Sequence, residues 1–447
     1  MIKQLPLPRL IAYGLTGLPL ATLGLPLYVY LPTYYARDLM LGAPLVGSIL
    51  LAARLFDVVT DPAAGFMSDR LTLDNWRRRA MMVMGVPWLL IGIWMLFLPP
   101  AGIGAGWLLL GTLLAYLGWT LVSIPYAAWG AELSPDYHER SRLAASREGF
   151  QALGVLLALA VPTWAGIAED AGATLRLLFA CVALTLPLTV LIAVKVLSES
   201  RWILQGPALT AGVRLLLGNQ PLRRLLLAYV LDGLANGLPA TLFLLFITER
   251  MQASEATGPL LILYFGMGVV ALPAWIGLAR KIGKHRAWAI SMGVAALSFT
   301  IVPWLGPDDL AVFTITVAFT GLTLGADMAL PTAIQADVVD VDTARGGGGR
   351  AGLLFGIWGM ATKLALALAV GIAFPLLGLA GYDPALQAQP TSALTALGFL
   401  YAGLPILLKL PCIYIAWCFP LDEHAQSDLQ REIRRRIQAR ELPNEDR

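Results

Sequence analysis

Charged residues are scarce in this chain of 447 residues. They make up 14% of it, whereas hydrophobic residues make up 57%. No soluble domain of this length can bury so much apolar surface, so the composition excludes a soluble protein and indicates many membrane-spanning segments. The formal net charge is only +3, which gives no reason to expect a nucleic-acid partner, and we expect none.

The residues of catalytic and metal sites are also few. The three cysteines lie in apolar runs without metal-type spacing, as small core residues do: Cys181, Cys412 and Cys418. The three histidines lie in predicted loops or the tail: His138, His285 and His424. The glycine run 346–349 lacks the Gly-Lys-Ser/Thr ending of a phosphate loop. We therefore expect no enzyme and no cofactor.

Long apolar runs are what the chain has in abundance. Twelve of them approach or exceed the ~20 residues that a membrane-spanning helix requires. These runs predict an all-α membrane protein with twelve transmembrane helices. Their approximate bounds are 10–35, 43–67, 80–98, 107–128, 150–168, 174–197, 225–248, 257–279, 288–305, 310–335, 352–377 and 393–419.

Lysine and arginine predict the orientation. Nearly all of them lie in connections on the side of the N-terminus, whereas the opposite connections hold only Arg37, Arg176 and Arg250. By the positive-inside rule, we expect both termini in the cytoplasm. The expected location is the cytoplasmic (inner) membrane, with multiple passes and the chain as a monomer.

The longest interior connection predicts the domain organisation. It separates an N-terminal six-helix bundle (1–198) from a C-terminal one (225–420), with a cytoplasmic linker at 199–224. A charged cytoplasmic tail follows at 421–447. Apolar Leu429, Ile433 and Ile437 recur at a spacing of four in the tail, which is typical of an amphipathic helix that touches membrane lipid. A solvated tail is the alternative.

Two aspartates interrupt the second apolar run. Asp57 and Asp61 are spaced i,i+4, so they point the same way, one helical turn apart. Two such carboxylates in an apolar helix cannot both stay charged and unpaired; they need a cation, a proton or a basic partner. The alternative to ion binding is a buried ion-pair network with Arg54, one turn earlier, and Lys363.

Three longer motifs resemble one transporter family. They are RLFDVVTDPAAGFMSD (54–69), IPYAAWGAELSPDYHERSRLAASRE (124–148) and ADVVDVDTARGGGGRAGLLFGIWGMATK (336–363). The chain resembles the glycoside–pentoside–hexuronide:cation symporters, the melibiose-permease branch of the major facilitator superfamily. The resemblance implies two six-helix bundles and alternating access. It further implies symport of a small-molecule sugar or glycoside with Na⁺, Li⁺ or H⁺.

The resemblance also implies a cation site. Asp57 and Asp61 match the family's paired carboxylates, and Thr60 and Thr120 match two polar positions beside them. Lys363 matches a lysine near that site, and we expect Lys363 and Arg54 to compensate charge when the cation leaves. Two carboxylates and one or two hydroxyls form the oxygen-rich set that a hard cation prefers. We expect Na⁺ at Asp57 and Asp61, with H⁺ as an open alternative.

The substrate is less well defined, because two acidic positions of melibiose permease are occupied here by Ala21 and Ser123. The galactoside-type carboxylate pair is therefore missing. The same branch contains lysolipid carriers that keep the aspartates, so an amphipathic cargo such as a lysolipid is the alternative to a sugar. The candidate substrate-binding residues are Trp119, Ser123, Tyr126, Arg147, Asp232, Asn236 and Trp358. Helix packing or a place at the membrane interface is the alternative for the three aromatic residues, and helix–helix hydrogen bonding is the alternative for Asp232, Asn236 and Asp327. For Arg147 the alternatives are a loop charge and closure of the cytoplasmic gate; Lys409 has no assigned role.

Charged residues at the predicted cytoplasmic ends form a candidate gate. We expect their salt bridges to hold the outward-facing state and to break when the bundles move. The gate residues are Asp69, Arg70, Glu132, Arg140, Asp337 and Asp340. A membrane sensor that transports nothing is disfavoured, because it leaves the buried charges without a purpose.

Overall fold

The computed structural model describes residues 5–24, 26–71, 76–167, 170–199, 218–347, 350–383, 386 and 388–441. Throughout these ranges the regular structure is helical, without strands, which confirms the all-α prediction. Most of the predicted linker 199–224 lies outside the described residues, at 200–217, as does the end of the tail at 442–447.

Within the described ranges, ten helical segments are long and apolar enough to cross a membrane, and they coincide with the third to twelfth predicted runs. Several of them continue through a short turn of another helix type. The segments are α5 (Arg77–Phe97), α6 (Ala105–Glu132), α7 (Tyr137–Trp164), α8 (Ala171–Val196), α10 (Gln220–Leu245) with η3 (Phe246–Arg250), η4 (Ser254–Ala256) with α11 (Thr257–Ile282), α12 (Lys284–Phe299) with η5 (Val302–Trp304), η6 (Pro307–Asp309) with α13 (Leu310–Asp342) and η7 (Thr343–Gly347), α14 (Ala351–Leu379), and α15 (Thr391–Gly398) with η8 (Phe399–Gly403) and α16 (Leu404–Trp417).

The first two predicted runs are also helical. The second forms α4 (Ala43–Arg70), 28 residues long. The first is divided into α1 (Leu7–Gly14), α2 (Gly17–Thr22), η1 (Pro26–Tyr30), α3 (Leu31–Thr33) and η2 (Tyr34–Asp38). Prolines recur through it, and each removes a backbone donor and displaces the turn before it, so one regular α-helix does not persist.

Two helices extend beyond their predicted bounds. Helix α7 begins at Tyr137, because the Asp136 carboxylate accepts hydrogen bonds from the backbone amides of His138 and Glu139, both at 2.9 Å. Arg140 therefore lies on a helix and not in the expected loop. Helix α13 likewise continues to Asp342 and includes two predicted gate aspartates.

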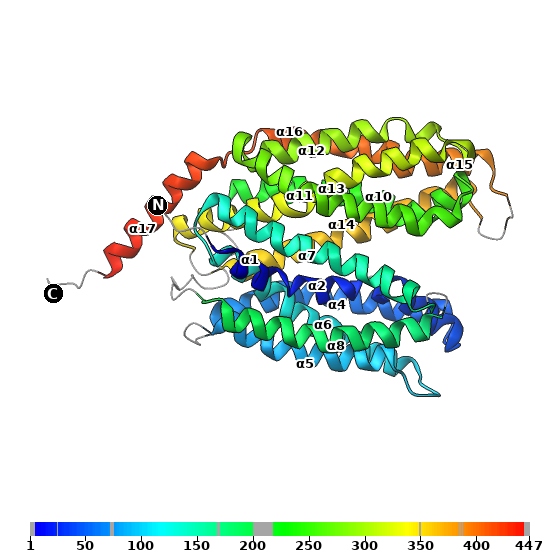
Figure 1. Ribbon diagram of the computed structural model, residues 1–447, viewed down its shortest axis with the longest axis horizontal. Coiled ribbons are helices and arrows are strands. Elements are labelled where there is room, and N and C mark those ends of the chain that lie inside the picture. The colour runs from blue at the N-terminus through cyan, green and yellow to red at the C-terminus, as the bar shows by residue number, and fades with distance from the viewer. Residues whose placement is uncertain are drawn as a thin grey trace. The chain divides into compact units, whose positions relative to one another are not determined.

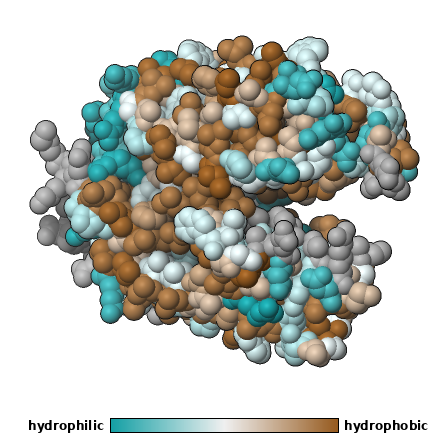
Figure 2. Space-filling view, turned by 45° about the vertical axis from the view of Figure 1, so that its right-hand side comes forward, coloured by the Kyte–Doolittle hydropathy of each residue, from teal (hydrophilic) through white to brown (hydrophobic). Residues whose placement is uncertain are grey.

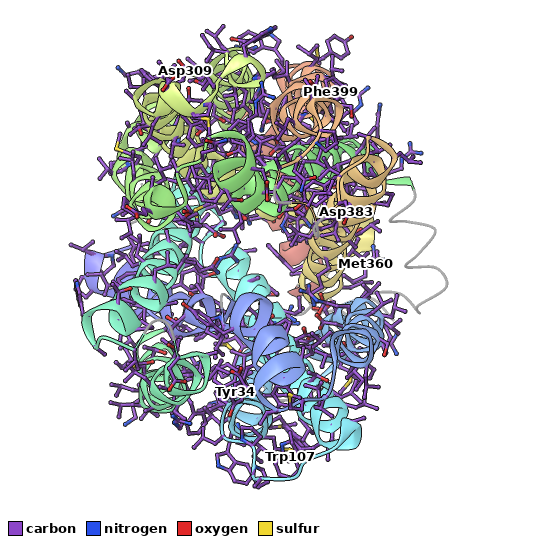
Figure 3. The ribbon with its side chains drawn as sticks, turned by 90° about the vertical axis from the view of Figure 1, so that its right-hand side faces the viewer. Tyr34, Trp107, Asp309, Met360, Asp383 and Phe399 are labelled. Atoms are coloured by element: carbon purple, nitrogen blue, oxygen red, sulfur yellow. The ribbon has the colours of Figure 1, made fainter. Side chains whose placement is uncertain are left out.

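Residue contacts divide the chain into two compact units. Unit 1 comprises 1–222, 332–360 and 420–447, and unit 2 comprises 223–331 and 361–419. Helices α13 and α14 each pass from one unit to the other; Met360, labelled in Figure 3, is the last residue of α14 in unit 1. The predicted division into bundles 1–198 and 225–420 stays a prediction.

In unit 1, helices α4, α5, α6 and α8 run side by side (Figure 1), with α5 and α6 in extensive contact. Glycines allow that contact, because a Cβ atom added at Gly118 would overlap the backbone of Leu89, and one at Gly92 would overlap that of Ala115. Small residues bring membrane helices together in this way.

The core of unit 2 is aromatic. The rings of Phe246 and Tyr401 stack with centroids 4.2 Å apart, and Phe313 packs against both. Arg250 donates hydrogen bonds to the carbonyls of Leu305 and Leu394 at 2.9 and 2.8 Å, and so ties η3 to two other segments of the unit.

The outer helix surfaces are apolar. Hydrophobic residues cover much of the face shown in Figure 2, and exposed side chains such as Leu51, Val59, Leu184 and Val270 occur on both units. Trp107 lies at the rim of unit 1 (Figure 3), and its indole donates to the Met95 carbonyl at 2.7 Å. An apolar exterior with aromatic residues at its margin is expected where lipid is the solvent.

The close α5–α6 contact predicts different effects for two glycines of α6. Gly118→Ala places a methyl group against the Leu89 backbone and is expected to destabilise the protein by about 1–3 kcal/mol. Gly106→Ala is the matched control, because a Cβ at Gly106 meets nothing within 4 Å. Thermal unfolding of the purified variants measures both, and equal stability would contradict the packing described.

Candidate functional site

The structure brings the predicted carboxylate pair together with Thr120. Asp57 and Asp61 of α4 are only 5% and 1% exposed. The Thr120 hydroxyl oxygen on α6 lies 3.0 Å from Asp57 Oδ1 and 2.8 Å from Asp61 Oδ1. One hydroxyl proton cannot be donated fully to both carboxylates, so oxygen lone pairs converge here. This is a set of ligands suited to a cation.

Glycines of α14 allow the backbone of this helix to lie directly against Asp61. A Cβ at Gly359 would lie 2.7 Å from Asp61 Oδ2, and one at Gly356 would lie 2.5 Å from the Asp61 carbonyl. Sequence reasoning did not include these glycines in the site. The spacing of Gly352 and Gly356, a small residue every fourth position, was the signal that could have identified a close helix contact.

The other residues predicted for the cation site have different positions. Thr60 donates its hydroxyl hydrogen bond to the Asp57 carbonyl of its own helix at 3.2 Å. The Arg54 guanidinium lies over the Tyr116 ring, 5.9 Å from its centroid. Lys363 belongs to unit 2, and its role in charge compensation stays a prediction.

An arginine that sequence reasoning had not selected is central to a cluster of predicted gate residues, called the first gate cluster below. The buried Arg78 guanidinium lies 2.6 Å from Asp69 Oδ1 and 2.8 Å from Glu132 Oε1. Arg77 joins Glu132 at 2.8 Å. The predicted gate residue Arg70 is instead exposed, with its guanidinium 4.4 Å from the Phe66 ring centroid. The triple arginine 77–79 was the available signal, but the sequence alone does not show which member turns inward.

Asp69 also fixes the start of α14. Its two carboxylate oxygens accept hydrogen bonds from the backbone amides of Gly352 and Leu353, both at 2.8 Å. Anionic groups are favourable at a helix N-terminus because amide donors there lack partners within the helix. Glu199 supports the same cluster by accepting from the Arg78 amide at 2.9 Å, and its burial raises its pKa because burial disfavours the charged form.

The second gate cluster joins three predicted residues. The Arg140 guanidinium is bidentate to Asp340, at 2.5 and 3.1 Å, and lies 3.2 Å from Asp337. The tail contributes to this cluster through α17 (Glu423–Glu441), which packs against α7 and η7. Gln426 and Gln430 of α17 both donate to Asp340. The beginning of the tail is therefore a docked helix and not a solvated segment.

Most candidate substrate residues have structural partners. Tyr126 is buried and donates to the Tyr13 carbonyl at 2.6 Å, with the two rings 4.8 Å apart. Arg147 pairs with Glu148 and donates to Thr332 at 3.3 Å. Of the remaining candidates in unit 1, Trp119 and Ser123 are half-buried and Trp358 is buried. Asp232 and Asn236 lie in a polar cluster of unit 2 with Lys409, which sequence reasoning had left unassigned.

Comparison with known proteins decides the family. The family model described as "MFS/sugar transport protein" matches residues 12–423. The chain belongs to this family. Within it, the chain is a glycoside–pentoside–hexuronide:cation symporter homologue, so it is a transporter and not an enzyme.

The relatives confirm this placement over nearly the whole length. The chain is 23% identical to the "Sodium-dependent lysophosphatidylcholine symporter 1-A" of Danio rerio, covering 92% of this chain and 85% of that protein. It is 22% identical to the "Glucuronide carrier protein homolog" of Escherichia coli (strain K12), covering 92% of each. The structure of the E. coli fucose:proton symporter FucP matches with a TM-score of 0.66 and 14% identity, covering 93% of this chain and 98% of that one. The major facilitator fold is thus confirmed.

The first gate cluster predicts a contrast between neighbouring arginines. Arg78→Ala leaves Asp69 and Glu132 buried without their central partner, and we expect a loss of about 3–5 kcal/mol in unfolding free energy. Arg70→Ala, the exposed control, is expected to change stability by less than about 0.5 kcal/mol. Thermal unfolding in detergent compares the two; equal losses would mean that the Arg78 ion pairs do not stabilise the protein.

Proposed function

We propose that the protein is a secondary active transporter that couples uptake of a sugar or glycoside to a monovalent cation by alternating access. The observation that carries the proposal is the convergence of Asp57, Asp61 and Thr120. Relatives named as glycoside/cation and sodium-dependent symporters support cation coupling. Na⁺ is the cation that we expect, since the set consists of oxygen ligands.

The physics of buried charge explains the coupling. Two carboxylates buried together repel each other and lose hydration, so the filled cation site is more stable than the empty one. A bound cation neutralises them, and Lys363 is proposed to take over when the cation leaves. Cation occupancy thereby changes which protein conformations are favourable, as coupling requires.

The gate clusters are proposed to resist opening toward the cytoplasm. Both clusters join helices from the first half of the sequence to the end of α13 or to the beginning of α14. Arg140 binds Asp337 and Asp340, and Asp69 binds the first turn of α14. Opening at this end must break these charge-assisted hydrogen bonds, which are stronger than neutral ones. The orientation, with both termini in the cytoplasm, rests on the distribution of lysine and arginine.

A lysolipid is the second candidate cargo. Ala21 and Ser123 stand where a galactoside carrier of this family has carboxylates, and a relative is named as a lysophosphatidylcholine symporter. Neither residue has a carboxylate to accept hydrogen bonds from sugar hydroxyls. Only the cargo differs between the two candidates; the proposed cation site is the same.

The cation site predicts the behaviour of three variants. Asp61→Asn is expected to abolish Na⁺-gradient-driven accumulation while the protein still reaches the membrane. Thr120→Ala is expected to lower the affinity for Na⁺ roughly 10- to 100-fold, because it removes an oxygen shared by both carboxylates. Thr60→Ala, whose hydroxyl bonds to its own helix, is the matched control and is expected to leave Na⁺ affinity unchanged.

These effects are measured as uptake of a panel of labelled glycosides across a range of Na⁺ concentrations, with and without a gradient. Uphill uptake by Asp61→Asn would refute the site. Equal Na⁺ affinities in the two threonine variants would remove Thr120 from it. Uptake that follows Li⁺ or H⁺ in place of Na⁺ would keep the site and change the coupling ion.

Ligand-dependent stability distinguishes the two cargoes. A ligand that binds the folded state raises its unfolding temperature by mass action. We expect at least one glycoside to stabilise the purified protein. Stabilisation by lysolipids, and by no sugar of the panel, would favour the second candidate.

A further inference from the structure

Unit 2 contains a second buried group of charges, apart from the proposed cation site. It comprises Asp232 on α10, Asp327 on α13 and Lys409 on α16. The Lys409 ammonium lies 2.6 Å from Asp232 Oδ1 and 3.8 Å from Asp327 Oδ2. The Lys409 side chain is fully buried, and those of Asp232 and Asp327 are 4% and 10% exposed.

Neutral donors complete the cluster. The Asn236 side-chain amide lies 3.3 Å from Asp232 Oδ2 and 3.3 Å from Asp327 Oδ2. From α12, the Trp288 indole donates to Asp327 Oδ1 at 3.1 Å. These contacts place Asp232 and Asp327 in one network, so the charge of each affects the other.

The charges of this cluster do not balance. Two ionised carboxylates and one ammonium leave one negative charge, and Lys409 is the only basic side chain in ion-pair contact with either aspartate among the described residues. The other titratable groups near the cluster are Tyr264 on α11 and Cys412 on α16, whose uncharged forms add no positive charge. An uncompensated charge at this depth is costly. The cluster therefore needs one further positive charge.

A proton suits the cluster better than a metal ion. The groups that face the carboxylates are N–H donors, namely the Lys409 ammonium, the Asn236 amide and the Trp288 indole. A hard cation requires oxygens at those places. No group of three or more potential metal-ligating His, Cys, Asp or Glu side chains was found among the described residues.

Hydrogen-bond geometry indicates which carboxyl group holds the proton. Asp232 has the shorter contact with the ammonium and is the ionised partner. The Ser291 hydroxyl can donate its one hydrogen either to the Trp288 carbonyl at 2.7 Å or to Asp327 Oδ1 at 3.3 Å, and the shorter contact to Trp288 is the stronger one. With its only hydrogen engaged, Ser291 presents a lone pair to Asp327. A protonated Asp327 can donate a hydrogen bond to that lone pair, whereas the lone pair would repel an ionised Asp327.

We propose that Asp327 is a proton-binding site in unit 2, separate from the cation site at Asp57 and Asp61. Asp327 holds the proton as a neutral carboxylic acid while Asp232 and Lys409 form the ion pair. A conformational change that separates Asp232 from Lys409 frees the ammonium to pair with Asp327, which then releases its proton. Transport thereby depends on pH through the protonation of Asp327 and not through the proposed Na⁺ site.

Infrared spectroscopy tests the proposal, because the C=O stretch of a protonated carboxylic acid is separate from the carboxylate bands. The protein is purified with Asp57→Asn and Asp61→Asn, so that this pair does not contribute. At neutral pH we expect a carboxylic-acid band that disappears at high pH. Asp327→Asn is expected to remove it. Asp232→Asn is expected to remove it too, since Asp327 then becomes the partner of Lys409.

Lys409→Met is the decisive companion variant. Without the ammonium, both carboxyl groups need a proton, so the band is expected to roughly double. A fully ionised, purely structural cluster predicts that Asp327→Asn leaves the carboxylic-acid band of the parent protein unchanged. An unchanged band in Asp327→Asn, or its absence from the parent protein, overturns the proposal. If Asp327→Asn does not fold, Asp232→Asn gives the same readout, because it too is expected to remove the band.

Uptake measurements distinguish this proposal from the symport proposal. Asp327→Asn in the otherwise native chain is expected to flatten the pH dependence of uptake and to keep its stimulation by Na⁺. Loss of Na⁺ stimulation in Asp61→Asn, with the Asp327 band retained, supports both proposals. Retained Na⁺ stimulation in Asp61→Asn refutes the cation site and leaves Asp327 unaffected.

Discussion

A charge inside an apolar membrane protein must be neutralised close by, and the polar structure of this protein follows from that constraint. Desolvation of an ion costs several kcal/mol unless a partner is present in good geometry. The carboxylates of α4 meet a hydroxyl from α6, and those of α10 and α13 share one ammonium from α16. In unit 2, two carboxylates share one ammonium among the described residues, which leaves room for a proton. The same imbalance that is unfavourable for folding is what we propose to be used for binding an ion.

Helices must approach closely for such partners to meet, and glycine makes this possible. Along α14, glycines face the backbone of α4, so that Asp61 and Gly359 are in near contact and Asp69 reaches the first amides of α14. A larger residue at Gly356 or Gly359 would displace α14 from the aspartates. The glycine positions therefore belong to the site as much as the charged groups do, although they have no chemistry of their own.

Arginine and lysine have different roles in the structure. Buried Arg78 and Arg140 each bind two carboxylates through several N–H groups, as a planar guanidinium allows. Such clusters hold particular helices together and must be broken as a whole. Lys409 is a point charge with one short and one longer contact. Its preference for one aspartate over the other can reverse with a small movement, which suits a site that exchanges a proton.

The amino-acid sequence by itself determined the membrane-spanning segments, the family and the direction in which Asp57 and Asp61 point, because these follow from local composition and helical periodicity. It also included Arg140, Asp337 and Asp340 among the six residues of an expected gate, and the structure joins these three by ion pairs. Only the tertiary structure decided that Arg78 and not Arg70 is the buried partner of Asp69, and that Asp327 shares Lys409 with Asp232. Thr60 and Thr120 were equivalent candidates in the sequence, but only Thr120, 59 residues from Asp61, turns toward the carboxylates. Periodicity defines the face of one helix, whereas the partner of a side chain depends on how separate helices pack, and that packing is a property of the whole chain.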